Sequence, residues 1–222
     1  NDTGQNDNLS YNILVYLEDE NNRVVGVNVP VESLEEDQIR QKWDLMTVNS
    51  DLLPENFVSS LPKEAVLESY EVIENELILY TNDAIKEANG RKAMESIAWT
   101  FIDDEIEIVS VYVKDQKVNA FGDYQFKQID KRNGINLNYE TLYLYESNAT
   151  TMIYYEDELV VPVTYFHLNE DVCSYIVNKV LDETVDNQYN YTIEDSVLTL
   201  DFVDASLLST NQITTIVESI DF

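Results

Sequence analysis

Apolar and polar residues alternate over short runs near the start of the chain. Residues 11–17 place an apolar side chain at every second position, and a second apolar run covers residues 24–31. A polar turn, residues 18–23, separates the two runs. Such alternation is typical of half-buried β-strands, so this stretch predicts two neighbouring strands joined by a turn.

Four further stretches repeat apolar residues every three or four positions, which brings those side chains to one face of a helix. They are residues 33–49, 90–102, 172–181 and 209–220. Two of them open on a capping box, Ser33 with Glu36 and Ser209 with Gln212, in which each side chain bonds the other residue's free backbone N–H. The pattern predicts four helices, two of which begin at these serines.

Alternating or β-branched runs predict further strands between the helices. They cover residues 65–73, 76–81, 105–113, 118–121, 141–145, 159–166, 189–194 and 197–203. Residues 148–158 are predicted to form a connection, with pairing left open for residues 152–155. Two of the strand pairs, 65–73 with 76–81 and 189–194 with 197–203, are expected to be hairpins.

The order of these elements occurs twice. The hairpin sequence of residues 73–80 returns about 120 residues later as residues 193–200, and the helix starts 34–37 and 168–171 also align. The last helical face matches the second one, with Ile213, Ile216, Val217 and Ile220 in place of Met94, Ile97, Ala98 and Phe101. The sequence therefore predicts an α+β fold of tandem duplicated repeats, each a small mixed or antiparallel sheet with two helices packed on one face.

The predicted repeats divide the chain into four parts. Residues 1–10 are a flexible N-terminal tether, 11–122 the first repeat, 123–138 a polar linker, and 139–222 the second repeat. The second repeat is expected to lack its closing strand, because the sequence stops where the first repeat has residues 105–113. Proteins usually cover an open sheet edge. We therefore expect this edge to pair with the first repeat, with residues 152–155, or with a neighbouring chain.

Charge narrows the possible partners. The chain has 43 acidic and 13 basic residues, a formal net charge of -30. Nucleic acids and anionic lipid head groups are bound through cationic side chains, so neither is an expected partner. After Arg132 the only basic residue is Lys179, against sixteen carboxylates. This imbalance fits either a solvated acidic surface or a face that binds a basic partner.

Cysteine content and the start of the chain bear on location. Cys173 is the only cysteine, which excludes an internal disulfide and favours a Gram-positive type of envelope over a disulfide-rich secreted scaffold. No apolar run reaches the roughly 20 residues of a membrane span. The polar start is expected where a signal peptide or lipoprotein signal has been removed, although a simple trim gives the same appearance.

Candidate catalytic and metal-binding residues are few. His167 is the only histidine, so a triad would need it, yet Cys173 lies on the apolar stripe of its helix. The acidic clusters 103–105 and 156–158 lack the spacing of a calcium loop and are predicted to be solvated turns. Among 43 carboxylates no glycosidase pair can be chosen. We predict no enzyme activity, no catalytic residue, no cofactor and no metal site.

Tyrosines are the remaining candidates for binding. The second repeat is rich in them, and Tyr143, Tyr145, Tyr154 and Tyr155 are the candidate surface for stacking on sugars or peptides. The alternative is that these rings pack within the strands, since tyrosine is a common strand residue.

Five segments within the repeats carry a family pattern, namely residues 13–16, 25–30, Leu61-Pro62 and 77–80 with Asp83 in the first repeat, and residues 198–202 in the second. Together they resemble the GerM domain of bacterial sporulation and spore germination proteins. The resemblance covers residues 11 to 222. It departs from the family pattern at Tyr80-Thr81, where the family usually has Asp-Phe, and in the second repeat, which has no Leu-Pro before its hairpin.

The resemblance implies a non-enzymatic, extracytoplasmic interaction module. It implies a tandem-domain lipoprotein that takes part in an envelope-associated protein assembly during sporulation or germination. The expected partners are envelope proteins or peptidoglycan, and membrane contact is expected only through an N-terminal lipid anchor. The alternative is a carbohydrate-binding or wall-modifying surface protein.

Overall fold

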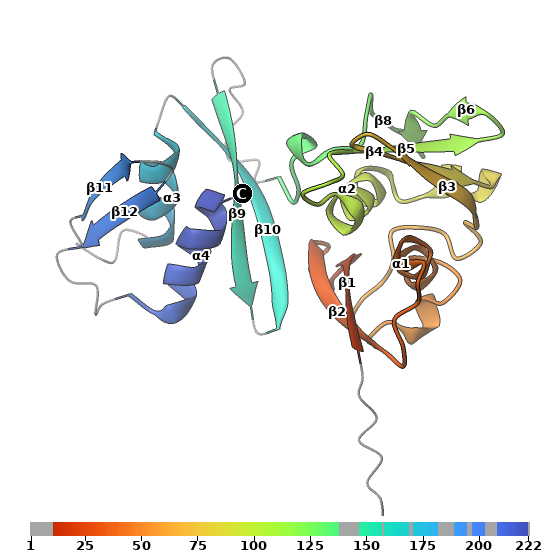
Figure 1. The fold of residues 1–222 in the computed structure, drawn as a ribbon, viewed down its shortest axis with the longest axis horizontal. Coiled ribbons are helices and arrows are strands. Elements are labelled where there is room, and N and C mark those ends of the chain that lie inside the picture. The colour runs from red at the N-terminus through yellow and green to blue at the C-terminus, as the bar shows by residue number, and fades with distance from the viewer. Residues whose placement is uncertain are drawn as a thin grey trace, which may run out of the picture. The chain divides into compact units, whose positions relative to one another are not determined.

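The computed structural model describes residues 11–137, 147–156, 158–168, 171–181, 189–194, 197–202 and 208–221. Helices and strands are mixed along the described chain, so the predicted α+β class is confirmed (Figure 1). The chain divides into two compact units. The first comprises Asn1–Asn136 with Glu156–Val161, and the second comprises Leu137–Tyr155 with Pro162–Phe222.

The first unit opens with the predicted pair of strands. β1 (Tyr11–Glu18) and β2 (Val24–Val31) pair antiparallel, with Tyr11 opposite Val31 and Glu18 opposite Val24. Ile13, Val15 and Leu17 are buried, as the alternation predicted, but Tyr16 of the other face is buried as well. Gly26 of β2 is also paired with Val160, one of the residues 156–161 that belong to this unit.

The second sheet of the first unit is mixed. Its order is β3 (Leu67–Ile73), β4 (Glu76–Thr81), β5 (Ile108–Val113) and β6 (Gln116–Lys117). β3 and β4 form the predicted hairpin, whereas β4 and β5 run parallel. Parallel neighbours need a crossover connection. Here the crossover contains η2 (Asp83–Glu87) and α2 (Gly90–Phe101).

The first helix begins later than predicted. α1 covers Gln38–Met46, and its N-cap is Asp37, whose side chain accepts a bond from the Arg40 N–H. The predicted capping box at Ser33 is therefore wrong. The side chain of Gln41 accepts from the Glu35 N–H and donates to the Ser33 carbonyl. These two backbone groups lie before the helix and are bonded by Gln41 instead of by a capping box.

The core of the first unit is built around α1 and α2. Trp43 is fully buried, donates from its indole N–H to the Ala65 carbonyl over 2.9 Å, and lies 6.4 Å from the Phe101 ring. Short elements complete the unit: η1 (Ser50–Leu52), β7 (Ala120–Phe121), β8 (Tyr124–Gln125) and η3 (Lys131–Asn133). The last two lie within the segment 123–138.

The remaining elements are β9 (Ser147–Glu156), β10 (Leu159–Leu168), α3 (Val172–Leu181), β11 (Tyr189–Glu194), β12 (Val197–Phe202) and α4 (Thr210–Asp221). They belong to the second unit, apart from residues 156–161 at the junction of β9 and β10, which belong to the first. β9 corrects the prediction that residues 148–158 are mainly a connection. The predicted strand 141–145 lies outside the described residues. The capping box before α4 is confirmed, because the Gln212 N–H donates to the Ser209 hydroxyl and the Ser209 N–H donates to the Gln212 side chain.

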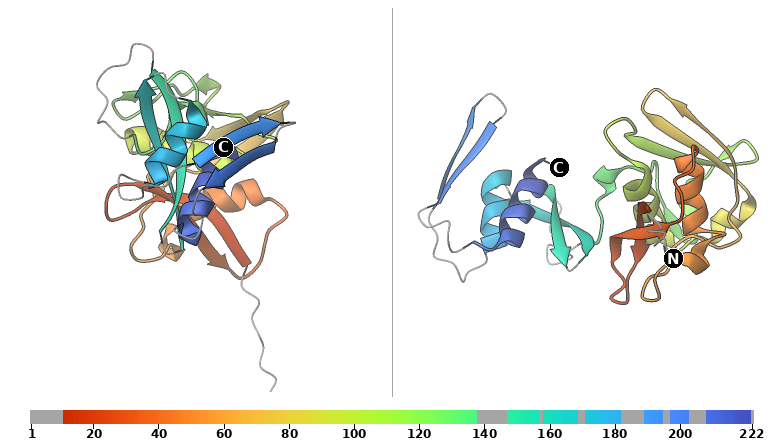
Figure 2. Two further views of the ribbon diagram at one scale, coloured as in Figure 1. Left: turned by 90° about the vertical axis from the view of Figure 1, so that its left-hand side faces the viewer. Right: turned by 60° about the horizontal axis from the view of Figure 1, so that its bottom comes forward.

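The core of the second unit lies between its helices and its hairpin. Figure 2 shows α3 and α4 side by side, with the β11–β12 hairpin beyond them. Val177, Leu181 and Ile216 are buried there. The half-buried residues packed against them are Val180, Tyr189, Leu200, Phe202, Leu208 and Ile220. None of the helices in the described part of the chain is long and apolar enough to cross a membrane.

The β11–β12 hairpin is a sheet of its own in the described part of the chain. Its two strands form a two-stranded sheet, and no third strand pairs with them among the described residues. Residues 152–155 lie in β9, whose neighbour is β10, so the predicted pairing of this edge with that segment is wrong. Pairing with a strand of the first repeat is absent from the described residues as well. Pairing with another chain stays a prediction.

Candidate functional site

The two repeats share contacts that define equivalent positions. In the first, the Tyr16 N–H of β1 donates to the Thr100 hydroxyl of α2 over 2.9 Å. In the second, the Ile153 N–H of β9 donates to the Ser219 hydroxyl of α4 over 2.9 Å. Both bonds are buried. The duplication therefore extends to single hydrogen bonds, and places where the repeats differ become candidates for function.

The helix caps repeat as well. Asp37 accepts from the backbone N–H three residues later, and Asp171 accepts from the Ser174 N–H over 2.9 Å in the same way. This backbone bond is the main reason that the pKa of the Asp171 carboxyl lies below its usual range. A carboxylate at a helix N-terminus stabilises the helix. These aspartates are therefore structural in both repeats.

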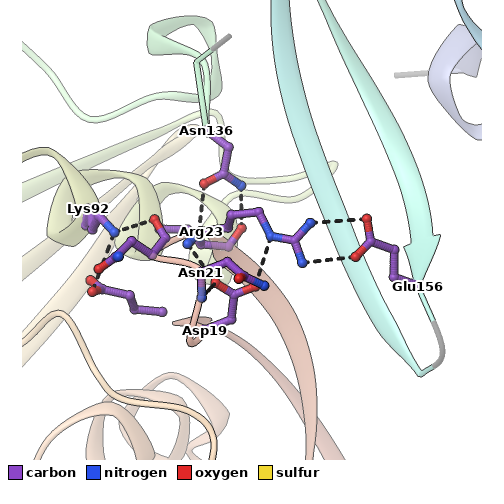
Figure 3. A network of polar contacts seen from close by, with 9 residues as sticks. Asp19, Asn21, Arg23, Lys92, Asn136 and Glu156 are labelled. Atoms are coloured by element: carbon purple, nitrogen blue, oxygen red, sulfur yellow. Dashed lines mark hydrogen bonds and ion pairs between the residues drawn. The ribbon is translucent and has the colours of Figure 1, made fainter.

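One difference is a polar network around the β1–β2 turn of the first unit (Figure 3). The Asp19 carboxylate accepts from the backbone N–H groups of Asn21 and Arg23, and from the Arg23 Nε over 2.9 Å. Only 7% of the Asp19 side chain is exposed. The carboxylate thus fixes both the turn and the direction of the guanidinium.

The remaining donors of Arg23 meet a second carboxylate. Its two terminal nitrogens donate to the two oxygens of Glu156 over 3.1 and 2.9 Å. These bonds raise the pKa of the Arg23 guanidinium, while burial opposes them. Glu156 is 51% exposed, so this bidentate pair is partly solvated. Arg23 thus forms a bidentate pair with a carboxylate of the same chain.

Asn136 and α2 hold the same turn from other sides. The Asn136 side chain accepts from the Val24 N–H and donates to the Val24 carbonyl, both over 2.7 Å. Lys92 donates to the Asn22 carbonyl and lies 3.5 Å from a Glu18 oxygen. Figure 3 shows these contacts together. Because each group bonds backbone or a neighbouring charge, the network stabilises the turn.

A buried ion pair lies next to this network. Arg91 donates to Glu95 over 2.6 Å, to the Tyr124 hydroxyl over 3.0 Å and to the Asn133 carbonyl over 2.5 Å. Glu95 is buried, and burial raises the pKa of its carboxyl, while the charge of Arg91 opposes that shift. The pair attaches the segment after β8 to α2. Its role is therefore structural.

The predicted tyrosine surface divides in the structure. Tyr143 and Tyr145 lie outside the described residues. Tyr154 is half-buried, with its hydroxyl 3.3 Å from that of Tyr165, and burial raises its pKa. Tyr155 is the next residue of β9, so its side chain points to the opposite face. Burial and the nearby Glu218 of α4 raise its pKa. Tyr154 and Tyr155 thus do not share one face.

His167 and Cys173 are both used in packing. The His167 ring is buried, with Nε2 2.8 Å from the Thr150 hydroxyl, and it stacks on Tyr175 at 4.2 Å. Cys173 is buried on α3, and burial raises the pKa of its thiol. A raised pKa disfavours the nucleophilic thiolate.

The two acidic clusters have different roles. The Asp103 carboxylate accepts from the backbone N–H groups of Glu105 and Ile106, as expected for a solvated turn. In the other cluster, Glu156 pairs with Arg23, and residue 157 lies outside the described residues. Across the described ranges, no group of three His, Cys, Asp or Glu side chains is placed to hold a metal ion.

The second difference between the repeats is on the last helix. Sequence periodicity predicted that Ile213 and Val217 belong to the buried face of α4. The structure corrects this, since they are 46% and 50% exposed, whereas Ile216 is buried. Their counterparts in α2, Met94 and Ala98, are 0% and 1% exposed. Comparing the two helices in the structure is what reveals this apolar surface.

Comparisons with known proteins define the fold. The structure is similar to the tandem GerMN domains of the sporulation protein GerM from Bacillus subtilis, with a TM-score of 0.80 and 19% identity. The match covers 96% of this chain and 86% of that one. The first GerMN domain of the same protein matches 55% of this chain and 98% of its own length, with a TM-score of 0.48 and 17% identity.

The sequence itself matches no family model and no curated protein. The predicted resemblance is therefore confirmed as a likeness of fold: the chain has the architecture of tandem GerMN domains. At this level of identity the fold alone is shared.

Proposed function

We propose that this chain is a sporulation-related GerMN-type protein that acts by binding other proteins of a bacterial envelope assembly. The observation that carries the proposal is the tandem fold, which matches tandem GerMN domains over 96% of the chain. An aspartate cap and a buried strand-to-helix bond recur at equivalent places in both repeats, which supports two domains of one type. The proposed location is outside the cytoplasm, behind an N-terminal lipid anchor.

The chemistry of the described residues supports a binding role over a catalytic one. The only histidine and the only cysteine of the chain are packed against neighbours. Glu95, the buried carboxylate of α2, is bonded to Arg91. These three groups thus have structural contacts, which favours a protein that works through its surface.

Charge supports a basic partner for the second unit. After Arg132, Lys179 stands alone against sixteen carboxylates. The Lys179 ammonium lies 4.8 Å from the centre of the Tyr165 ring, so this cation is placed over an aromatic face. A surface with such an excess of carboxylates attracts cationic partners and repels other polyanions.

The first test of the proposal is genetic. The gene is deleted in the source bacterium, and heat-resistant spores are counted after starvation, with a complemented strain as the control. The proposal expects fewer spores, restored by the wild-type copy. Unchanged spore counts contradict the sporulation role.

The second test is biochemical and addresses the acidic face. Tagged protein is crosslinked in sporulating cells and purified. Asp201 and Glu218, both exposed in the second unit, are changed to Asn and Gln, and the matched control changes Glu35 and Glu36 of the first unit to Gln. The proposal expects partner recovery to fall for the first pair only. Equal recovery from both variants contradicts an acidic docking face.

The wall-binding alternative has its own test. The purified chain is sedimented with peptidoglycan sacculi from which teichoic acid has been removed, because its phosphates would repel a chain of net charge -30. Under the proposal the chain stays in the supernatant at low and physiological salt. Pelleting that survives salt instead favours the glycan-binding alternative, and the tyrosines of the second unit become the residues to change.

A further inference from the structure

The mixed sheet of the first unit, β3 to β6, has an inner and an outer face. The inner face carries buried apolar side chains, namely Leu77, Leu79, Val109 and Val111. α1 contacts β3 and α2 contacts β5, and Figure 1 shows both helices on the same side of the sheet. Because side chains alternate across a strand, the outer face carries the intervening residues, among them Ile78, Tyr80 and Tyr112. These three side chains are partly exposed.

Two tyrosines lie side by side on the outer face. Tyr80 of β4 is the register partner of Tyr112 of β5. Their ring centres are 5.7 Å apart, and the ring planes are inclined by 40°. Tyrosine is enriched among the residues that dominate protein interfaces, because a rigid ring buries a large area at little cost in side-chain entropy. The pair is therefore an aromatic surface suited to contact with another molecule.

Carboxylates lie beside these rings. The Tyr80 hydroxyl donates to the carboxylate of Glu71, the β3 residue that is paired with Ile78. This bond, and more weakly the negative charge of Asp115, raises the pKa of the Tyr80 phenol. Glu71 and Asp115 are both exposed. The aromatic surface is therefore bordered by negative charge that a partner can reach.

The lysines near this surface already have acidic partners. The Lys117 ammonium of β6 lies 4.0 Å from a Glu76 oxygen, and Lys114 bonds the Asp83 carboxylate. Their positive charges are thus largely balanced by those carboxylates. The charges of Glu71 and Asp115 are left to attract a cation from outside.

Another contact in the first unit shows which cation suits a tyrosine beside a carboxylate. The guanidinium carbon of Arg91 lies 5.7 Å from the centre of the Tyr124 ring. The same guanidinium donates to the Tyr124 hydroxyl over 3.0 Å and to the Glu95 carboxylate over 2.6 Å. Ring, hydroxyl and carboxylate thus bind one arginine together. Tyr80 with Glu71 presents the same three groups at the surface.

We propose that Tyr80, Tyr112 and Glu71 bind an arginine side chain of a protein partner. The guanidinium would lie against the rings and donate to the Glu71 carboxylate. Arginine fits this surface better than lysine, because its planar guanidinium is less strongly hydrated, stacks on aromatic rings and donates in a fixed fork. This inference rests on the proposed function in one respect, namely that the chain acts by binding proteins.

Charge favours this occupant over two others. A sugar ring also stacks on tyrosine, but it is neutral and gains no attraction from the charges of Glu71 and Asp115. A second copy of this chain would bring two net charges of -30 together, which repel each other. A basic protein segment gains from the rings, from the nearby carboxylates and from the net charge of the chain.

The test compares two peptides of equal charge on the full chain. The probe is Gly-Arg-Ser-Arg-Gly, blocked at both ends, and the comparison peptide is Gly-Lys-Ser-Lys-Gly. Binding is followed by the backbone amide shifts of the isotope-labelled protein in NMR titrations at low ionic strength, where exposed charges are screened least. The expected shifts lie in residues 69–73, 76–81 and 108–113. The arginine peptide should bind about two- to fivefold more tightly, the size expected of an exposed cation–ring contact.

Substitutions separate the ring from the charge. Tyr112→Leu should remove the preference for arginine, whereas Tyr112→Phe keeps the ring and should keep the preference. The matched control is Tyr11→Leu, which changes an exposed tyrosine of β1 in the same unit and should have no effect.

The charge is tested with a second pair of variants. Glu71→Gln should weaken both peptides, and Glu36→Gln, at an exposed glutamate before α1, should weaken neither. Tryptophan fluorescence during unfolding checks that each variant is folded. Because Glu71 is exposed, its variant tests the site even where Tyr112→Leu lowers the stability of the sheet.

Four results would overturn the inference. They are equal affinity for the two peptides, equal effects of Tyr112→Leu and Tyr11→Leu, shifts confined to other elements, and stronger binding of an N-acetylglucosamine oligomer at the same amides. If the arginine peptide fails while crosslinking still recovers envelope partners, only this site is wrong. If the peptide binds as expected while the deletion leaves spore counts unchanged, only the proposed function is wrong.

Discussion

The repeated buried bond gives a sharp prediction about stability. Thr100→Val keeps the shape of the side chain but removes the hydroxyl that accepts the Tyr16 N–H over 2.9 Å. Thr100 is buried, so water cannot easily replace that acceptor. Losing one partner of a buried hydrogen bond costs about 1–3 kcal/mol. We expect the free energy of unfolding of the first unit to fall by about 2 kcal/mol.

The two units can be followed separately because both tryptophans, Trp43 and Trp99, lie in the first. Tryptophan fluorescence during urea unfolding therefore reports on that unit. With a typical urea dependence for a small domain, a loss of about 2 kcal/mol lowers the midpoint by about 1 M. Thr100→Val should shift the tryptophan transition by this amount.

The equivalent change in the second unit is the matched control. Ser219→Ala removes the acceptor of the Ile153 N–H, so it should destabilise the second unit and leave the tryptophan transition in place. Far-UV circular dichroism should show its effect instead. A shift below about 0.3 M for Thr100→Val would refute the assigned bond. An equal tryptophan shift for both variants would refute separate unfolding.

Three further predictions concern single side chains. Burial raises the folded-state pKa of Glu95, so the folded state binds more protons than the unfolded state. The free energy of unfolding should therefore fall as pH rises from the ordinary glutamate range through the raised pKa. Glu95→Gln should flatten this pH dependence in urea unfolding at pH 4 to 8. Asp19→Ala removes three bonds and should cost about 2 kcal/mol by the same assay. Glu156→Ala, which loses only the half-exposed pair with Arg23, should cost about 0.5–1 kcal/mol, and the reverse order would contradict the structure. Ser209→Ala removes the cap of α4 and should cost about 1 kcal/mol by circular dichroism, with Ser209→Gly costing less.

Local sequence signals predicted the elements whose causes are local. The capping box at Ser209 formed as expected, because its two partners are three residues apart. The box at Ser33 did not form. Instead, the side-chain amide of Gln41, in α1, bonds the Glu35 N–H and the Ser33 carbonyl. A capping pattern shows that a helix start is possible, but the competing acceptor is visible only in three dimensions.

Features that depend on distant residues could not be predicted. Arg23 and Glu156 are separated by 133 positions, and neither lies in a recognisable motif. The parallel pairing of β4 with β5 depends on the path of α2. Periodicity showed that one face of the last helix is apolar, yet Ile213 and Val217 of that face are exposed. Burial is a property of the neighbours as much as of the helix.

Photo-crosslinking in sporulating cells tests the central claim most directly, namely that this chain binds another protein through its second unit. A photoreactive phenylalanine analogue is placed at Val217 in one strain and at Val172 in another, since the two positions are exposed to a similar extent. We predict a crosslink from Val217 to an envelope protein and none from Val172. Identical patterns from both positions, or no protein crosslink from Val217, would contradict the account.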